Sequence, residues 1–528
     1  MVLRFLWAAW LVCAAVAAAV AGSMLSPWWW CAAGPLLALA ALAVADLLQT
    51  RHAVLRNYPV LGHLRFALES IRPELQQYFI ERNVDGRPFD RDTRSIVYQR
   101  AKGTDAEEPF GTELDLYESG REFLVPSMAP VAVRTDPPRV WIGGPDCTQP
   151  YGMALLNVSA MSFGSLSANA VLALNAGAAM GGFAHDTGEG GLSEYHLRPG
   201  GDLVWEIGTG YFGCRTQDGG FDPGLFAEKA SHPQVRCVSL KLSQGAKPGI
   251  GGVLPGAKVN AEIARVRGVP QGESVISPPY HRVFSTPREL VLFIARMREL
   301  ADGKPTGFKL CVGSRRQFLA VCKAMLDEGV TPDFIIVDGA EGGTGAAPLE
   351  FADHMGMPLT EGLLTVHNAL LGAGLRDRIR IGASGKIATG SDVVKRLIQG
   401  ADYTNAARAM MFAVGCIQAQ RCHTNTCPTG VTTQDPRRAR ALHVRDKSRR
   451  VQRFQESTVK SALQIMAAMG IDDPSQLSPH LLRRRLDAQT IRSYAEIHPP
   501  LAPRQLIDDT PEAWAHDWHS AHPDHFIL

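Results

Sequence analysis

The pattern of apolar and polar positions divides the chain into an apolar beginning and a long alternating region. Residues 2–22 are apolar except for Arg4, and residues 28–48 are interrupted only by Asp46. Each run has about the 20 residues that a helix needs to cross a hydrocarbon core of roughly 30 Å. Trp28, Trp29 and Trp30 lie at the break, where aromatic side chains favour a membrane interface. The pattern predicts a transmembrane helical hairpin.

Basic residues flank the outer ends of this hairpin. Arg4 precedes the first run, and Arg51, Arg56 and Arg65 follow the second. By the positive-inside rule both ends face the cytoplasm. We therefore expect a multi-pass protein of the inner membrane whose catalytic domain is cytoplasmic. A cleaved signal peptide over the first run is the alternative, and the second run argues against it.

From residue 154 onward, short β-rich runs alternate with amphipathic helical runs. The expected strands are 154–161, 184–187, 208–214, 236–243, 307–312, 333–338, 378–383 and 403–407. The expected helices include 168–179, 289–300, 317–327, 361–371 and 391–398. Alternation of this kind implies parallel strands with right-handed crossovers, and eight units predict an α/β fold, a (β/α)₈ TIM barrel. An open, doubly wound sheet is the alternative.

Glycine and polar residues gather directly after five of the expected strands. These loops are 162–165, 188–191, 244–247, 342–345 and 384–386. Because barrel active sites lie at the C-terminal ends of the strands, we expect the five loops to meet at one mouth. The long excursion 244–306 is expected to be functional or to form a lid.

Composition narrows the class of protein. Hydrophobic residues make up 45% and charged residues 20%, with a net charge of +2. This indicates a globular chain with no case for nucleic acid, which favours a basic excess. The ten cysteines are too sparse for a disulfide framework and indicate reduced thiols.

One group of cysteines is close together. Cys416, Cys422 and Cys427 follow a C-x5-C-x4-C spacing that ends in Cys-Pro. Three such thiols suit a [3Fe–4S] cluster, or a [4Fe–4S] cluster that lacks one protein ligand. Zinc fits only if His423 completes a tetrahedral site. Ordinary buried cysteines are the remaining alternative.

This cysteine loop resembles the iron–sulfur loop of glutamate synthases. Further motifs occur in that family's order at 160–167, 187–191, 241–249, 277–279, 342–346 and 384–390. The resemblance covers about residues 154–434 and implies the family's FMN-binding synthase domain, which is a (β/α)₈ barrel. We expect a hairpin at 1–50, a linker region packing on the barrel at 51–146, the synthase domain at 147–435 and a helical extension at 436–528.

The resemblance also implies an FMN site across the barrel mouth. Ala160, Met161 and Ser162 would line the flavin ring. Lys309 would lie near its N1–O2 edge, where a cation stabilises the reduced flavin, unless it forms only a salt bridge at the edge of the core. The phosphate would be held by Gly342, Gly343, Thr344, Gly385, Ala407 and Arg408.

By the same resemblance, 2-oxoglutarate would bind Gln244, Lys247 and Arg267, with Glu189, Lys247 and Gln244 catalytic. Ammonia would condense with the 2-oxo carbon, and reduced FMN would deliver a hydride to give L-glutamate, with electrons arriving through the cluster. Arg267 lies in a helical run, so a solvated helix face is the alternative for it.

The chain also departs from the family. We expect no glutaminase domain, and Ile250 stands where the family commonly carries an acid. Without a G-x-G-x-x-G motif after a strand, an NAD(P)H site is not expected. Ferredoxin or a reductase subunit, another source of amine and a separate glutaminase subunit are then implied. The alternatives are an N-methylglutamate synthase-like activity and a non-catalytic membrane flavin and iron–sulfur redox protein.

Overall fold

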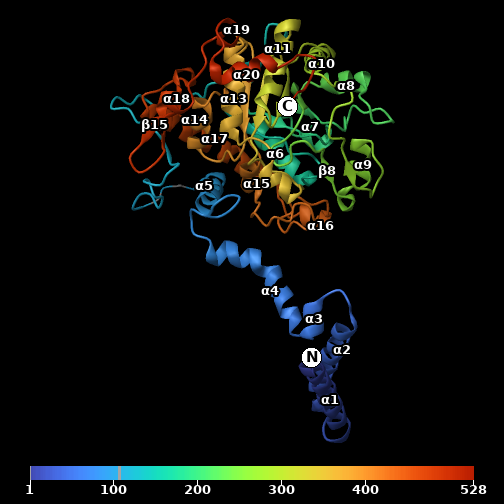
Figure 1. Ribbon diagram of the computed structural model, residues 1–528. Helices are drawn as coiled ribbons and strands as arrows, with labels where there is room; N and C mark the ends of the chain where they lie inside the picture. Colours follow the sequence, from blue (N-terminus) through green and yellow to red (C-terminus); the bar gives the residue numbers. More distant parts are fainter. Residues whose placement is uncertain (1, 105–106, 108, 528) are drawn as a thin grey trace. The chain divides into compact units, whose positions relative to one another are not determined.

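The computed structural model describes residues 2–104, 107 and 109–527 (Figure 1). It divides into two compact units, Met1–Pro88 and Phe89–Leu528, called unit 1 and unit 2 below. The expected boundaries at residues 50, 146 and 435 stay predictions.

Unit 1 contains the two long apolar helices. Its elements are α1 (Val2–Met24), the 3₁₀ turn η1 (Pro27–Trp29), α2 (Trp30–Leu48), α3 (Ala53–Asn57), α4 (Gly62–Leu75) and the π-helical turn η2 (Gln76–Ile80). The segments Phe5–Met24 and Pro27–Leu48 have mean hydropathies of 2.1 and 2.0. Both segments are long and apolar enough to span a bilayer. Small side chains, including Ala8, Ala15 and Ala43, pack α1 on α2. That the pair crosses a membrane stays a prediction.

The side chain of Asp46, the acid in the second apolar run, is buried within unit 1. Its carboxylate accepts hydrogen bonds from the Val60 amide at 2.8 Å and from the His63 ring at 2.9 Å. A buried carboxylate requires such partners, so this contact fixes the start of α4 against the end of α2.

Unit 2 is built around a closed barrel of eight parallel strands. They are β4 (Leu156–Val158), β5 (His185–Asp186), β6 (Leu203–Ile207), β7 (Val235–Lys241), β10 (Thr306–Leu310), β11 (Phe334–Asp338), β12 (Arg380–Ser384) and β13 (Tyr403–Ala406). Each strand pairs with the next, and β13 pairs with β4 to close the ring. The predicted TIM barrel is confirmed, and the open sheet is wrong.

Helices follow the strands as expected. The larger ones are α6 (Ala168–Gly181), α8 (Pro223–Ala230), α10 (Pro287–Leu300), α11 (Arg315–Glu328), α13 (Leu359–Gly372), α14 (Gly390–Ile398) and α15 (Arg408–Val414). Shorter pieces are α7 (Glu194–Leu197), α12 (Leu349–His354) and, in the excursion, β8 (Val253–Leu254), η3 (Gly256–Lys258), α9 (Ala261–Arg267) and β9 (Val275–Ile276).

One expected strand was placed wrongly. The third barrel strand is β6, whose five residues are all buried, and not the segment 208–214. That segment forms successive turns, in which the Tyr211 amide bonds the Gly208 carbonyl and the Cys214 amide bonds the Tyr211 carbonyl. Tyr211 and Gly213 have positive φ, which a strand does not tolerate. Gly208, Gly210 and Gly213 favour turns over a strand in this segment.

The strands separate an apolar layer from a charged layer inside the barrel. Side chains two residues apart share a face. Val204, Phe334 and Ile336 belong to a small apolar cluster that β2 (Val140–Ile142) and β3 (Tyr151–Met153) help to form. One step further along the same faces lie Glu206 and Asp338. The polar layer is therefore nearer the C-terminal ends of the strands, where the site is expected.

The rest of unit 2 surrounds the barrel. The remaining elements are α5 (Arg91–Lys102), α16 (Pro436–Ala439), α17 (Val444–Ala468), η4 (Pro474–Gln476), η5 (Pro479–Leu481), α18 (Tyr494–Ile497), α19 (Gln505–Asp508) and α20 (Glu512–Ser520). A small sheet joins β1 (Glu122–Leu124) to β14 (Leu482–Arg485) and β15 (Ile491–Ser493), so the C-terminal region includes strands besides the expected helices. The long helix α17 packs on α6 and α5.

We predict that Gly177→Ala weakens unit 2 where α6 meets α17. A Cβ at Gly177 would lie 2.6 Å from the Cβ of Val451 and 2.8 Å from the Ser448 carbonyl oxygen. Overpacking of this kind costs about 1–3 kcal/mol, to be measured by urea unfolding of the full chain in detergent. Gly313→Ala is the control, because nothing lies within 4 Å of a Cβ there. Equal stability of the two variants would contradict the packing.

Candidate active site

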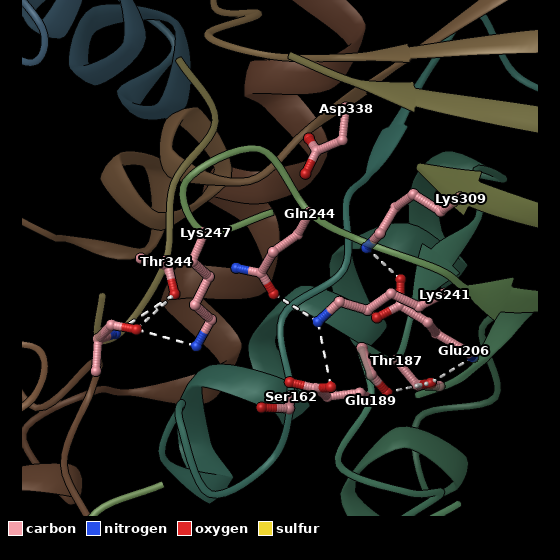
Figure 2. A network of polar contacts seen from close by, with 12 residues as sticks. Ser162, Thr187, Glu189, Glu206, Lys241, Gln244, Lys247, Lys309, Asp338 and Thr344 are labelled. Atoms are coloured by element: carbon pink, nitrogen blue, oxygen red, sulfur yellow. Dashed lines mark hydrogen bonds and ion pairs between the residues drawn. The ribbon is translucent and has the colours of Figure 1, made fainter. Parts of the chain in front are cut away.

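The five glycine-rich and polar loops do follow strands of one barrel, and Figure 2 shows side chains of four of them close together at its mouth. Ser162 follows β4, Glu189 follows β5, and Gln244 and Lys247 follow β7. Thr344 follows β11. The strands themselves contribute Glu206, Lys241, Lys309 and Asp338, which the figure shows between these loops.

Lys309 forms a buried ion pair with Glu206 across the barrel interior. Their side chains are 6% and 1% exposed, so both charges are removed from water. Although burial lowers the pKa of Lys309, the negative charges of Glu206 and Asp186 raise it further, and the net shift is upward. Burial and the charge of Glu206 raise the pKa of Asp186 in turn. Lys309 is therefore a cation held in a salt bridge, which was one of its two expected roles. The other role, beside a flavin, stays a prediction.

Lys241 joins Glu189 to Gln244. It is in register with Lys309 on the neighbouring strand, so the two lysines lie side by side. Its Nζ lies 3.2 Å from Oε2 of Glu189 and donates a hydrogen bond to Oε1 of Gln244. His281 Nε2 contacts the Lys241 carbonyl oxygen at 2.9 Å. Lys241, which was not expected in the site, thus holds Glu189 and Gln244, which were.

Glu189 stands among three cations. Burial raises its pKa, but Lys241, Lys247 and Arg267 lower it further, and the net shift is downward. The Glu189 carboxylate is therefore ionised. Burial lowers the pKa of Lys247 to about 8, partly opposed by Glu189. Lys247 Nζ donates to the Ala346 carbonyl at 3.0 Å, which turns it toward the loop after β11.

Two glycines make room for the Glu189 carboxylate. A Cβ at Gly252 would lie 2.1 Å from its Oε1, and a Cβ at Gly208 would lie 2.7 Å from its Oε2. The excursion that carries Gly252 therefore folds back over the mouth and contacts the site directly.

Arg267 is buried and does not belong to a solvated helix face, so that alternative is wrong. It is 5% exposed, donates to the Phe163 carbonyl at 3.0 Å and lies over the ring of Phe212 at 5.0 Å. Burial lowers its pKa to about 10, with Glu189 opposing the shift. Its Nη2 also reaches Ser162 Oγ at 3.4 Å, which brings Ser162 into the same group.

The residues expected around a phosphate come from three neighbouring strand ends. Arg408 begins α15, and its Nη2 donates to the Glu341 carbonyl at 2.6 Å. A Cβ at Gly343 would lie 2.9 Å from Arg408 Nε, so glycine keeps the space beside the guanidinium open. Gly342, Thr344, Gly385 and Ala407 belong to the same three loops. Glycine amides beside an arginine suit an anion.

The residues expected to line the flavin ring follow β4. Met161 is buried, whereas Ala160 and Ser162 are half-buried. Gly188 approaches this segment so closely that a Cβ would lie 2.6 Å from the Ser162 amide nitrogen. The backbone after β4 and the backbone after β5 therefore pack against each other at the mouth.

The three cysteines of the loop after α15 interact electrostatically. Burial, and then the charges of Cys422 and Cys427, raise the pKa of Cys416 to about 12. Burial also raises the pKa of Cys427, but contacts with Thr432 and Thr429 lower it to about 7, toward the thiolate that metals bind. Within the described residues, no three His, Cys, Asp or Glu side chains are close enough to hold a metal ion.

The loop is also tied to its surroundings. Asn425 Nδ2 donates to the Ala257 carbonyl at 3.0 Å, and the Tyr98 hydroxyl donates to the Cys416 carbonyl at 2.7 Å. Lys258, almost fully buried, donates to the Ser165 carbonyl at 3.1 Å. Burial lowers its pKa to about 8, while Cys422 and Cys427 raise it, so Lys258 lies between the site loops and the cysteines.

Sequence reasoning missed four charged residues of this site: Asp186, Glu206, Lys241 and Asp338. Asp338 accepts a hydrogen bond from the Gly245 amide at 2.8 Å and so fixes the loop after β7. Glu206 was missed because the third strand was placed too late in the chain. A charged residue inside the apolar run Leu203–Ile207 was the available signal.

Comparison with known proteins agrees with this geometry. Residues 151–472 match the family model described as the conserved region in glutamate synthase. The chain is 37% identical over 506 residues to the glutamate synthase large subunit-like protein YerD of Bacillus subtilis, covering 88% of this chain and 96% of that protein. It is 34% identical over 322 residues to the archaeal glutamate synthase (NADPH) of Methanocaldococcus jannaschii, covering 61% of this chain and 60% of that protein.

Longer relatives and solved structures are also similar. The chain is 36% identical over 287 residues to the large chain of Bacillus subtilis glutamate synthase (NADPH), covering 18% of that protein. A flavocytochrome b2 mutant with pyruvate bound is 14% identical at a TM-score of 0.41, covering 85% of this chain and 91% of that chain.

Fold and site together define a (β/α)₈ barrel with a buried, charged candidate active site at its mouth. The chain belongs to the glutamate synthase family and is a glutamate synthase-like oxidoreductase.

We predict that Glu206→Gln strongly destabilises unit 2, because it leaves Lys309 buried without its counterion. Breaking a buried pair by removing one partner costs about 3–5 kcal/mol, to be measured by urea unfolding of the full chain in detergent. The matched control is Glu299→Gln, which breaks the exposed pair with Arg296 and is expected to cost at most about 1 kcal/mol. A similar loss in both variants would show that burial of the Lys309 pair does not matter.

Proposed function

We propose that this protein converts 2-oxoglutarate and ammonium to L-glutamate by reductive amination. The observation that carries the proposal is the arrangement of Lys241, Lys247 and Arg267 around the ionised Glu189. Two carboxylates of a dicarboxylate need cationic partners, and the amine needs a proton acceptor beside them. The reaction balances as 2-oxoglutarate, ammonium, two electrons and two protons giving glutamate and water.

Each residue of the site then has a role. Lys247 and Arg267 bind the substrate carboxylates as charged donors. Glu189 accepts protons from the amine nitrogen as the imine forms, since neighbouring cations keep it ionised. Lys241 positions Glu189 and Gln244 by its contacts with both. The excursion over Glu189 limits the access of water, which strengthens these interactions.

FMN fits the barrel mouth as the cofactor. The open space beside Arg408 at Gly343 suits a phosphate, and Lys309 supplies a fixed buried cation for the flavin ring. Gly342, Thr344, Gly385 and Ala407 would complete the phosphate site, and Ala160, Met161 and Ser162 would line the ring. When bound, FMN supplies the hydride that reduces the imine.

An iron–sulfur cluster of the [3Fe–4S] type at Cys416, Cys422 and Cys427 completes the proposal; since no three such side chains among the described residues are close enough to hold a metal, the thiols would have to converge when the cluster binds. Its support is the spacing of the cysteines, their mutual interaction and the low pKa of Cys427. When bound, the cluster supplies electrons singly to the flavin. Ferredoxin or a reductase subunit would be the electron donor, and a glutaminase subunit would be one source of ammonia.

We also propose that α1 and α2 anchor the protein in the cytoplasmic membrane as a hairpin, with unit 2 in the cytoplasm. The length and hydropathy of both helices and the arginines beyond their ends support this topology.

The test of the proposed reaction is anaerobic. The full chain, purified in detergent and reduced with dithionite, receives 2-oxoglutarate with ammonium or with methylamine. We expect rapid reoxidation of the flavin absorption band with ammonium, together with one glutamate per flavin reoxidised. Faster turnover with methylamine would favour an N-methylglutamate synthase-like reaction instead. No reoxidation with either amine, in protein that contains flavin, would contradict amination and leave a redox role.

We predict that Gly252→Ala preserves the fold but reduces kcat/KM for 2-oxoglutarate about 10²-fold. The new Cβ would displace the flexible end of Glu189 from Lys241, and misplacement of a catalytic group by about 1 Å has an effect of this size. Gly313→Ala, at a position with open space, is the control and is expected to keep its activity. Unchanged activity of Gly252→Ala would remove Glu189 from the mechanism.

A further inference from the structure

Positive charge is concentrated in one stretch of unit 2. Residues 435–453 contain eight lysines and arginines but only two acids, Asp435 and Asp446. The stretch covers α16 and the first turns of α17. Its exposed arginines, which we call the basic patch, are Arg437, Arg438, Arg440, Arg445, Arg449 and Arg453.

Most of this charge is not neutralised by the protein. Asp435 pairs with Arg438 at 3.6 Å, and Asp446 pairs with Arg450 at 3.0 Å and Lys447 at 3.1 Å. In the part of the chain that the structure describes, no carboxylate forms an ion pair with the other five arginines of the basic patch. These are Arg437, Arg440, Arg445, Arg449 and Arg453. Unpaired like charges in one stretch repel each other, so a surface that keeps them suits an anionic partner.

Residues of the stretch 435–453 approach both ends of the cysteine loop. Arg438 Nη1 donates to the Thr426 carbonyl at 3.3 Å, directly before Cys427. Lys447, from the same stretch, has its Nζ 3.9 Å from the position of a Cβ at Gly415, directly before Cys416. A partner that covers the basic patch would therefore also cover the loop.

Unit 2 begins at the same place. Phe89, its first residue, donates its amide hydrogen to Gln418 Oε1 at 3.1 Å and accepts from Gln418 Nε2 at 3.0 Å. The following helix α5 packs on α15 and α17, and Arg453 Nη1 donates to the Lys102 carbonyl at 3.2 Å. The chain that arrives from the two long apolar helices thus joins unit 2 beside the cysteine loop and the basic patch.

We propose that the basic patch binds the headgroups of anionic phospholipids and so holds the cysteine loop at the membrane surface. Clusters of basic residues held near the cytoplasmic surface of a bilayer bind anionic lipids, each charge adding to the attraction. A tether that begins in the bilayer and joins unit 2 beside the basic patch keeps the patch at a high effective concentration near lipid. The position of the tether favours lipid over an acidic soluble protein, because the tether would not bring a soluble protein closer to the basic patch.

The proposal rests on the membrane anchor of the proposed function and not on the amination reaction. The full chain is reconstituted into nanodiscs of phosphatidylcholine alone, or with one-third phosphatidylglycerol, and hydrogen exchange of residues 435–453 is measured. We expect severalfold slower exchange in the anionic discs, which high salt reverses because it screens exposed charges.

A quadruple variant tests the charge itself. Arg437→Gln, Arg440→Gln, Arg445→Gln and Arg449→Gln together are expected to abolish the slower exchange. The matched control removes four exposed arginines elsewhere, Arg198→Gln, Arg296→Gln, Arg483→Gln and Arg492→Gln, and is expected to keep it. Both variants are expected to retain flavin reoxidation by 2-oxoglutarate and ammonium in detergent, since none of these arginines lies in the site.

Equal exchange in neutral and anionic discs would overturn the proposal, as would equal loss of protection in both variants. Exchange that slows only when an acidic ferredoxin is added would assign the basic patch to an electron-carrier protein and also overturn it. If the chain does not co-elute with discs, the anchor itself fails, and the lipid proposal fails with it. Loss of amination with intact lipid protection would instead contradict the proposed reaction alone.

Discussion

The buried ion pair between Lys309 and Glu206 is the constraint on which the site depends. Removing two charges from water is costly, and the cost is recovered only by close pairing in a fixed geometry. The barrel provides that geometry because β6 and β10 flank β7 and direct both side chains inward. A fixed cation then lies beside Lys241, which is held in turn by Glu189 and Gln244. The mouth of the barrel is thus organised before any ligand binds.

The same network explains why the loops are rich in glycine. Glu189 fits only because residues 208 and 252 carry no side chain. The loop after β7 is fixed by Asp338 and passes so close to the next loop that a Cβ at Gly245 would lie 1.8 Å from the Gly339 carbonyl oxygen. Charged groups in the strands therefore position the loops, and glycines allow the loops to approach them.

Much of the fold followed from local pattern. Seven of the eight expected barrel strands overlap the observed ones, and the expected helices 168–179 and 289–300 overlap α6 and α10. The exception is β6, whose apolar run Leu203–Ile207 was passed over for the glycine-rich turn that follows it. The buried state of Arg267 could not be predicted either, since it depends on Phe163 and Phe212 from distant segments.

The cysteine loop connects the site to the first residues of unit 2. Arg408, expected beside the phosphate, lies over the ring of Phe89 at 4.9 Å, and Phe89 is bonded to Gln418. One short stretch therefore joins the end of the barrel where the phosphate is expected, the cysteines and the first residue of unit 2. Sequence predicted the cysteines from their spacing, but their link to Phe89 spans over three hundred residues and only the fold reveals it.

The central claim is that the cations around Glu189 bind a dicarboxylate. The most direct measurement is calorimetric titration of the full chain in detergent with 2-oxoglutarate, compared with Lys247→Met and with Lys460→Met, an exposed lysine of α17. The account predicts that Lys247→Met weakens binding at least about tenfold, as expected for losing a charged hydrogen bond, while Lys460→Met does not change it. Equal affinity of all three proteins would contradict the assignment of this site to 2-oxoglutarate.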